Sequence, residues 1–334
     1  MENILPVVWF GIIGFGVFMY VLMDGFVLGI GILGFFADDS DQLDHMMNTA
    51  APIWDGNETW LVLGGAGLLA AFPSAYAIIL SGLYLPVLLM LVALVLRGVS
   101  FEFRFKATTS KALWGSCFAL GSIAAAFAQG VMLGAIVEGL PLEQGRYLGG
   151  PLAWFGPFPM LTGVALVFGY ALLGSTWLIL KTEGPLQSAA FLVTRPLVAI
   201  VVLFMGLVSA WLPYLSSHIM SRWFETGNFK WLFPVPLAAL SNAVLLWMAV
   251  KRKAERSPFW LAVTFFGLGF VGLVIGLWPN IVPPDLSIWD AAAPPSTQSF
   301  VLVGTLIMLP AILGYTWWSY SVFRGKVVAG AGYH

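Results

Sequence analysis

The sequence predicts an all-α integral membrane protein, and three observations support this fold class. Of its 334 residues, 60% are hydrophobic and only 9% are charged, whereas soluble domains carry roughly 25% charged residues. The mean hydropathy is +0.91. Apolar runs of about 20 residues recur, and a helix of that length crosses a hydrocarbon layer of about 30 Å. Because no connection between the runs is long enough for a soluble domain, we expect residues 1–334 to form a single membrane domain.

Nine apolar segments predict nine transmembrane helices. The first is long enough to tilt or to protrude from the bilayer. It follows a start, "MENILPVVWF", that lacks the basic region and cleavage site of a secretory signal, so we expect this span to be retained. The two longest connections, 138–157 and 279–299, are rich in proline and glycine and are expected to be compact and non-helical. The nine predicted spans are 8–36, 52–72, 75–97, 112–137, 158–180, 196–214, 232–250, 259–278 and 300–323.

The basic residues orient the predicted helices. With nine spans, the side that holds the N-terminus carries only Arg146, Arg222 and Lys230, so the remaining 12 of the 15 lysines and arginines lie on the opposite side. Connections rich in lysine and arginine stay in the cytoplasm. We therefore expect the N-terminus outside and the C-terminus inside the cell.

The chain offers little redox or metal-binding chemistry of its own. Its three histidines, His45, His218 and His334, lie in predicted loops or at the C-terminus, whereas a membrane haem or copper site needs such ligands within the spans. The single cysteine excludes a disulfide framework, and no nucleotide-binding or nucleophile motif is present. We therefore expect no catalytic group, cofactor-binding residue or metal ligand in this chain. The net charge of −1 gives no indication of a nucleic-acid partner, and none is expected.

Asp24 lies within the first predicted span, in "YVLMDGFVLGIGILGFF". An ionised aspartate at such a position costs about 2.5–3.5 kcal/mol on insertion scales, so it indicates a specific role. Gly25, Gly29, Gly31 and Gly34 form a small-residue face that lets another helix approach closely. Two interpretations stay open: a carboxyl group that joins two helices by hydrogen bonding, and a carboxylate on a proton or ion path.

Asp55 and Glu58 lie at the start of the second span, in "WDGNETWL". Three residues apart, they face the same side of a helix. Pro52 suits the first turn of that helix, whose positive amino end stabilises carboxylates, and this gives a structural interpretation. The functional interpretation is the entrance of a proton pathway, at which these carboxylates take up protons from the cytoplasm. The spacing does not distinguish the two.

Other polar groups fit structural roles. Arg97 and Arg104 close the third span in "LRGVSFEFRFK", where the positive-inside rule and snorkelling account for them, and Glu102 is expected to pair with a neighbouring base. Gln129, in the fourth span, is expected to form hydrogen bonds between helices.

Together these motifs resemble subunit II of the bacterial bd-type quinol oxidases (cytochrome bd oxidases), most closely the cyanide-insensitive branch. The matching stretches occur in order over nearly the whole chain: "MDGFVLGIG", "PIWDGNETWL", "LRGVSFEFR", "QGVMLG", "GYALLGSTWLILKTEG", "WPNIVPP" and "YTWWSYSVFRGKV".

The resemblance implies a nine-helix subunit of the bacterial inner membrane, built as two four-helix bundles and one peripheral helix, with a periplasmic N-terminus and a cytoplasmic C-terminus. It implies a similarly folded partner, subunit I, which carries haem b, haem d and the quinol-oxidising site, and no haem in this chain. Such a complex oxidises ubiquinol or menaquinol and reduces dioxygen to water with protons from the cytoplasm. A bound ubiquinone, a small accessory subunit and lipid contacts are left open by the resemblance.

The resemblance also implies a proton route through Asp55, Asp24 and Glu58. Asp55 matches the aspartate of the family's W-D-G-N motif, implied in proton intake toward subunit I, and Asp24 matches the acid of its D-G-F stretch, on or near that route. Val27 stands where a second acid is often found, which argues against a relay of several acids along the first span. Glu58 stands where glutamine also occurs, so its carboxylate can be dispensable.

Two other interpretations are kept. One is a proton-coupled secondary transporter that uses Asp24 and Asp55 as coupling carboxylates, because glycine-interrupted helices are typical of transporters. The other is a purely structural partner whose polar groups are satisfied internally. A transporter is complete in one gene, whereas an oxidase subunit should be encoded beside a histidine-bearing membrane partner.

Overall fold

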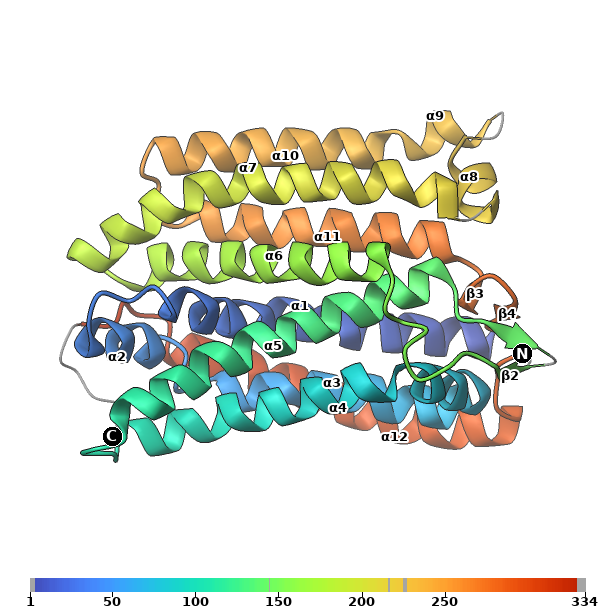
Figure 1. Cartoon of the computed structure of the whole chain (residues 1–334). Coiled ribbons are helices and arrows are strands. Elements are labelled where there is room, and N and C mark those ends of the chain that lie inside the picture. Colours follow the sequence, from blue (N-terminus) through green and yellow to red (C-terminus); the bar gives the residue numbers. More distant parts are fainter. Residues whose placement is uncertain (1–3, 144, 216, 225–226, 329–334) are drawn as a thin grey trace.

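The computed structural model describes residues 4–143, 145–215, 217–224 and 227–328, and it is mainly helical (Figure 1). Two short antiparallel hairpins, β1–β2 and β3–β4, are the strands of the described residues. In chain order the elements are α1 (Leu5–Gly34), α2 (Ser40–Asn48), α3 (Trp54–Ala71), α4 (Pro73–Arg104), α5 (Lys111–Glu138), β1 (Leu142–Glu143), β2 (Arg146–Tyr147), α6 (Pro157–Lys181), α7 (Gly184–Leu215), α8 (Ser217–Phe224), α9 (Asn228–Leu232), α10 (Pro234–Lys251), α11 (Ser257–Leu277), β3 (Asn280–Val282), β4 (Leu286–Ser287) and α12 (Pro295–Val322).

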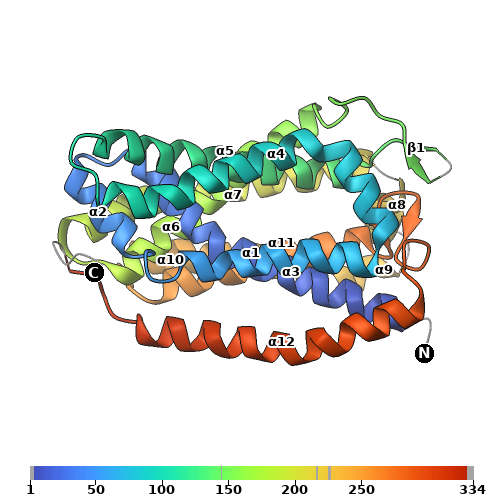
Figure 2. The ribbon, with the colours of Figure 1, turned by 90° about the horizontal axis from the view of Figure 1, so that it is seen from below.

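The long helices run side by side along the molecule. In Figure 1, α6, α7, α10 and α11 form the upper part, and α1, α3, α4, α5 and α12 form the lower part. The hairpins, α8 and α9 gather at one end, named here the hairpin end. The opposite end, named the α2 end, holds α2 and the end of α12 (Figures 1 and 2).

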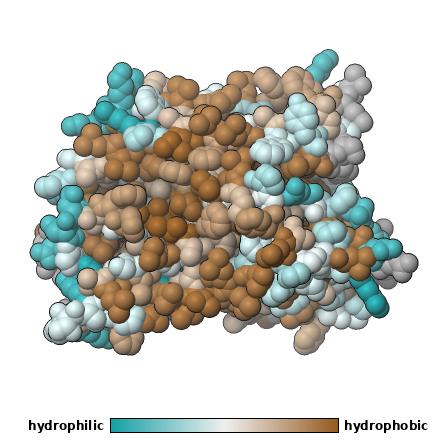
Figure 3. All heavy atoms as spheres, viewed as in Figure 1, coloured by the Kyte–Doolittle hydropathy of each residue, from teal (hydrophilic) through white to brown (hydrophobic). Residues whose placement is uncertain are grey.

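The face of the molecule seen in Figure 1 is apolar between these two ends. Figure 3 shows hydrophobic side chains across the middle of one face and hydrophilic side chains toward both ends. Within the described residues, eight helices are long and apolar enough to cross a membrane. The expected all-α membrane protein is therefore confirmed. Of the nine predicted spans, 52–72 is the one without a counterpart among these eight: its helix, α3, carries Asp55, Asn57 and Glu58 in its first turns, and these residues lower its hydropathy.

The helix boundaries differ from the predicted spans where charged residues continue a helix. α4 extends to Arg104 rather than ending at residue 97, and α7 begins at Gly184 rather than at residue 196. Hydropathy ends a span where the polar residues begin, whereas a helix continues beyond the hydrocarbon layer if its backbone bonds are satisfied. The acidic connection predicted as a loop contains α2, because the Asp39 side chain accepts a hydrogen bond from the Gln42 backbone N–H (2.7 Å) and caps this helix.

The centre of the protein lies where α1 and α6 cross. Residues 24–32 of α1 and 169–179 of α6 are all buried. The backbones touch here: a Cβ added to Gly29 would lie 1.8 Å from the carbonyl oxygen of Tyr170, and one added to Gly174 would lie 2.4 Å from the carbonyl carbon of Gly29. The close approach predicted for the glycines of the first span is confirmed at Gly25 and Gly29, which face α6, whereas Gly31 faces Ser122 of α5 and Gly34 faces Leu43 of α2.

α12 lies at one edge of the molecule, beside α3 and α1 (Figure 2). Gln298 is its one buried residue within the described chain. The Trp9 indole N–H donates to the Gln298 carbonyl oxygen (3.1 Å) near the start of α12, and the Tyr320 hydroxyl donates to the Asn57 side-chain oxygen (2.9 Å) near its end. The helix is therefore attached near its ends rather than along its length.

Candidate functional site

A buried ion pair joins α1 to α4 in the half of the bundle nearer the α2 end. One guanidinium nitrogen of Arg97, Nη2, lies 2.8 Å and 2.7 Å from the two carboxylate oxygens of Asp24. The same nitrogen lies 3.1 Å from Oε1 of Glu58 on α3. The side chains of Arg97 and Asp24 are 0% exposed and that of Glu58 is 34% exposed. One arginine thus faces two carboxylates, one sealed inside the protein and one that reaches its surface.

The burial of Arg97 corrects the expectation that it snorkels to the membrane surface. Its stem is long enough to do so, but Asp24 lies inside the bundle, and a buried carboxylate without a counter-ion is strongly destabilised. Arg97 therefore turns inward, and its guanidinium lies 5.5 Å from the centre of the Trp54 ring. Its Nε and Nη1 atoms are buried and have no hydrogen-bond partner among the described residues.

Arg104, which was given the same explanation, is also buried, at 2% exposure. Its Nε donates to Asp44 of α2 (2.9 Å), and its Nη1 and Nη2 donate to the carbonyl oxygens of Lys111 (2.7 Å) and Ser40 (3.1 Å). Arg104 thereby fastens α2 to the α4–α5 connection. The expected pairing of Glu102 is confirmed, because it accepts a hydrogen bond from Lys106.

Polar side chains from four helices surround the ion pair. The Gln129 amide of α5 donates to the Tyr20 hydroxyl (2.8 Å) and accepts from the Tyr170 hydroxyl (2.8 Å), which confirms its predicted role between helices. Asn57 of α3 donates to the carbonyl oxygen of Met23 on α1 (2.8 Å). These bonds hold α1, α3, α5 and α6 around the buried charges.

The structure brings together two of the three predicted proton-pathway residues. Asp24 and Glu58 meet at Arg97. Asp55, in the first turn of α3, is exposed and does not touch Arg97. The helix-start interpretation of Asp55 and the proton-intake interpretation are both compatible with this position.

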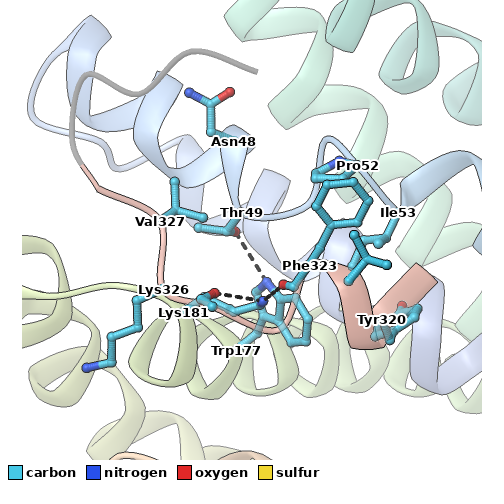
Figure 4. Close-up of a pocket in the computed structure, with 12 residues that line it drawn as sticks. Asn48, Thr49, Pro52, Ile53, Trp177, Lys181, Tyr320, Phe323, Lys326 and Val327 are labelled. Atoms are coloured by element: carbon cyan, nitrogen blue, oxygen red, sulfur yellow. Dashed lines mark hydrogen bonds between the residues drawn. The ribbon is translucent and has the colours of Figure 1, made fainter. Parts of the chain in front are cut away.

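A cavity of about 250 Å³ opens at the α2 end of the same helices. Its lining includes Thr49, Trp177 and Tyr320, and residues 323–328 after α12, named here the strap, run over it (Figure 4). Lys181, only 5% exposed, donates to the carbonyl oxygens of Phe323 and of Gly325.

The strap is held by further contacts. The Val327 N–H donates to the Lys181 carbonyl oxygen (2.8 Å), and Nε2 of His45 lies 2.9 Å from the Val327 carbonyl oxygen. Since a carbonyl oxygen only accepts, the His45 nitrogen donates. His45 was predicted in a loop and lies in α2; His334 lies outside the described residues, and the side chain of His218 is not described.

Comparison with known sequences decides the family of this chain. The sequence profile of the cytochrome bd terminal oxidase subunit II family matches residues 5–323. The chain belongs to this family.

Relatives with names of the same family are similar to this chain over nearly its full length. The probable cytochrome oxidase subunit 2 of Haemophilus influenzae is 29% identical over 95% of this chain and 92% of its own length. The cytochrome bd ubiquinol oxidase subunit 2 of Bacillus subtilis is 28% identical over 96% of each chain. A chain of the bd oxidase structure from Geobacillus thermodenitrificans has the same fold, with a TM-score of 0.77, 17% identity and coverage of 96% of this chain and 98% of that one.

As subunit II of a bd-type oxidase, the chain is a multi-pass protein of the cell membrane and part of an oxidoreductase complex. The family implies a partner oxidase subunit that holds the haems. Within the described part of this chain, no group of three or more His, Cys, Asp or Glu side chains could hold a metal ion.

Sequence reasoning missed the two residues that complete the buried cluster of this subunit II, Arg97 and Tyr20. Arg97 carries no local signal for burial, because its partner Asp24 is 73 residues away. Tyr20 did carry one: it lies four residues before Asp24 and therefore on the same face of a helix.

Proposed function

We propose that this chain is a haem-free subunit II of a quinol:oxygen oxidoreductase, which scaffolds the haem-bearing subunit I and delivers cytoplasmic protons for the reduction of dioxygen to water. The observation that carries the proton-delivery part is the Arg97 cluster, in which a surface-reaching carboxylate and a sealed carboxylate share one buried cation. Ionisable groups inside a membrane bundle are costly and typically mark proton or ion paths. The family match favours this function over a transporter complete in one chain.

The proposed route begins at Asp55 and passes Glu58 to Asp24. Asp55 is exposed in the first turn of α3, and Glu58 follows it on the same helix face. Each carboxylate takes a proton from water or from the group before it, forms an O–H bond, and is ionised again when it passes the proton on. Arg97 stabilises the ionised forms of Glu58 and Asp24, so both stay ready to accept a proton.

The proposed architecture is a single membrane domain of nine spans, in two groups of four helices with α12 at the periphery. α3 supplies the ninth span, and the packing of α1 with α3 and α5, and of α6 and α10 with α7 and α11, supports the two groups. We place the α2 end in the cytoplasm, because most lysines and arginines lie at this end, and the N-terminus in the periplasm of a bacterial inner membrane. Single cysteines introduced at the two ends test this orientation. In intact cells, a membrane-impermeant thiol reagent should label cysteines at the hairpin end and leave those at the α2 end unlabelled.

The proposed partners follow from the same function. Subunit I holds haem b and haem d, and ubiquinol and dioxygen react through the complex; the Bacillus subtilis relative is named a ubiquinol oxidase subunit. No nucleic acid is expected. A bound ubiquinone, a small accessory subunit and specific lipid contacts stay predictions.

A paired experiment tests the proposal. The tagged chain is purified gently from its native membrane, a reduced-minus-oxidised spectrum is recorded, and quinol-driven oxygen consumption is measured for wild type, Asp55→Asn, Asp24→Asn and Asp41→Asn. Asp41 is an exposed acid of α2 and serves as the matched control. We expect haem bands in all four preparations, with turnover reduced at least tenfold in Asp55→Asn and Asp24→Asn only. Haem bands with unchanged turnover would contradict the proton route but leave the subunit function intact; absence of haem bands would contradict both.

A further inference from the structure

The cavity under the strap holds a positive charge without a matching negative one. The described residues that line it include two lysines, Lys181 and Lys326, and no aspartate or glutamate. The Lys326 ammonium group pairs with Glu255 at 2.7 Å, and in Figure 4 this side chain points away from the rest of the lining. Lys181 is only 5% exposed, and it forms no ion pair with a carboxylate of the described residues. The unmatched charge at the cavity is therefore that of Lys181.

The contacts of Lys181 orient its ammonium group and leave its charge in place. It donates to the carbonyl oxygens of Phe323 and of Gly325, the second at 3.0 Å. Its Nζ lies 5.1 Å from the centre of the Trp177 ring, within the range of a cation–π interaction. These three partners are uncharged, and an ammonium group has three N–H donors. Because a buried charge without a counter-ion is costly, the site favours an anion as a further ligand.

Two other hydrogen-bonding side chains of the lining are engaged within the protein. Thr49 donates to the Met46 carbonyl oxygen (2.8 Å). The Tyr320 hydroxyl donates to the Asn57 side-chain oxygen (2.9 Å). Lys181 differs from them because its charge is not balanced by its contacts. A lysine binds a phosphate group as a point charge, without the paired geometry that an arginine requires.

The cavity also meets the apolar surface of the bundle. Val322, the last residue of α12, lines the cavity and is 56% exposed, and Phe323 beside it is 40% exposed. About one turn earlier, α12 exposes Trp317 and Trp318 at the edge of the molecule (Figure 2). The volume of about 250 Å³ is several times the roughly 30 Å³ that one water occupies. A ligand can therefore place an anionic group at Lys181 and an apolar part along α12.

We propose that this cavity binds the phosphate group of an anionic phospholipid, with the Lys181 ammonium group as its counter-ion and the acyl chains along α12. A soluble phosphate carries the same charge but makes no use of the apolar opening at Val322 and Phe323. Most lysines and arginines lie at this end of the bundle, and they attract anionic headgroups. The strap runs over the cavity (Figure 4), so the bound headgroup lies beneath it. This inference goes beyond the proposed function and does not depend on the proton route.

Native mass spectrometry of the complete two-subunit complex tests the site. The complex is stripped of lipid by detergent exchange and titrated with dioleoyl phosphatidylglycerol, with zwitterionic phosphatidylcholine and with inorganic phosphate. We expect phosphatidylglycerol to bind about tenfold to hundredfold more weakly to Lys181→Met than to wild type, because a hydrogen bond to a charged group is worth about this much. Lys181→Arg keeps the charge and should retain most of the affinity. Lys106→Gln, at an exposed lysine, is the matched control and should bind as wild type.

A second variant separates lipid binding from loosening of the strap. Lys181→Met also removes two hydrogen bonds to the strap, whereas Val322→Trp keeps Lys181 and narrows the opening of the cavity. Both should weaken the binding of phosphatidylglycerol, and unchanged haem bands show that the complex is still assembled. Binding as tight as in wild type by either assembled variant would overturn the proposal. Binding of inorganic phosphate without a preference for phosphatidylglycerol over phosphatidylcholine would overturn the assignment to a lipid.

Discussion

Arg97 of α4 and Asp24 of α1, 73 residues apart in the chain, are joined through a single guanidinium nitrogen that contacts both carboxylate oxygens at 2.8 Å and 2.7 Å. Both side chains are 0% exposed. Each charge offsets the cost of burying the other, so a change of Arg97 alone leaves Asp24 as an unpaired ion inside the bundle, whereas a change of Asp24 alone leaves Arg97 beside Glu58. The two helices are thereby tied together at the depth where the proposed proton route ends.

The ion pair predicts strong coupling between two substitutions. Arg97→Met should lower the free energy of unfolding of the complex by about 3–5 kcal/mol, because it strands a buried carboxylate. Adding Asp24→Asn should restore much of this loss, since no buried charge then remains. A double-mutant cycle measured by denaturant unfolding of the detergent-solubilised complex gives the coupling, expected at about 2–3 kcal/mol, the upper part of the range for residues in contact. Additive losses in the double variant would contradict the pair.

The crossing of α1 and α6 predicts sensitivity to a single methyl group. Gly29→Ala would place a Cβ 1.8 Å from the Tyr170 carbonyl oxygen, and backbone cannot move aside as a side chain can. We expect a loss of about 1–3 kcal/mol or failure to assemble with the partner subunit. Gly11→Ala, on the same helix with nothing within 4 Å of the added carbon, is the matched control and should be neutral or slightly stabilising. Thermal unfolding followed by haem release distinguishes the two.

The two hydrogen bonds from Lys181 to the strap predict that this side chain stabilises the strap. Its ammonium group donates to the carbonyl oxygens of Phe323 and Gly325, and Lys181→Met leaves both acceptors without this donor. We expect about 1–3 kcal/mol less stability and faster cleavage within residues 323–328 by a protease. Lys326→Gln, which removes a more exposed contact, should accelerate cleavage less. Equal cleavage of Lys181→Met and wild type would show that the strap does not depend on this lysine.

The strap should also loosen in acid. The hydrogen bond and charge of Lys326 hold the pKa of Glu255 below its usual range, and Glu255 in turn raises the pKa of Lys326. Because the pKa of Glu255 is lowered, the contact contributes fully to stability above the usual glutamate pKa of about 4.3. This contribution is lost as the pH falls through the lowered pKa. For a lysine with a raised pKa, the contribution is complete below about 10.4 and is lost as the pH rises through the raised value. The contribution of the Lys326–Glu255 contact to stability is thus constant between about pH 5 and 10.

Fluorescence anisotropy measures this loosening, with a dye on Val328→Cys in a Cys117→Ala background. Anisotropy should fall below about pH 4, and by less in high salt, which already screens an exposed pair. Glu255→Gln should remove most of the acid transition, leaving the longer contact of Lys326 with Glu183 at 3.5 Å. A transition centred near neutral pH would contradict the assignment.

The sequence predicted the helices well and their mutual contacts poorly. Hydropathy located the eight helices that are long and apolar enough to cross a membrane, because burial in lipid demands long apolar runs. α4 and α7 continue beyond the predicted spans, because polar and charged residues can continue a helix outside the hydrocarbon layer. Asp24 and Glu58 could be selected from their rarity in apolar segments, and the structure places both at one cation.

The rest depended on packing between distant segments. Arg97 was assigned to the membrane surface by a rule that holds for most arginines at helix ends, and only the position of Asp24 inside the bundle shows why it turns inward. The Tyr20–Gln129–Tyr170 chain crosses three helices whose contacts no local pattern specifies. α2 was missed because its core-facing side has only three buried residues in a strongly acidic stretch.

Synthesis proceeds from the N-terminus, so α1 to α11 leave the ribosome before α12 does. Residues 24–32 and 169–179 can therefore close against each other while the last helix is still being made. α12 then adds Gln298 alone to the buried part of the described chain and joins a bundle that is already packed. The strap is made after it, and its partners Lys181, His45 and Glu255 come from segments that are all in place by then. The strap can therefore be fastened only after α12 has been made, later than the closure of α1 against α6.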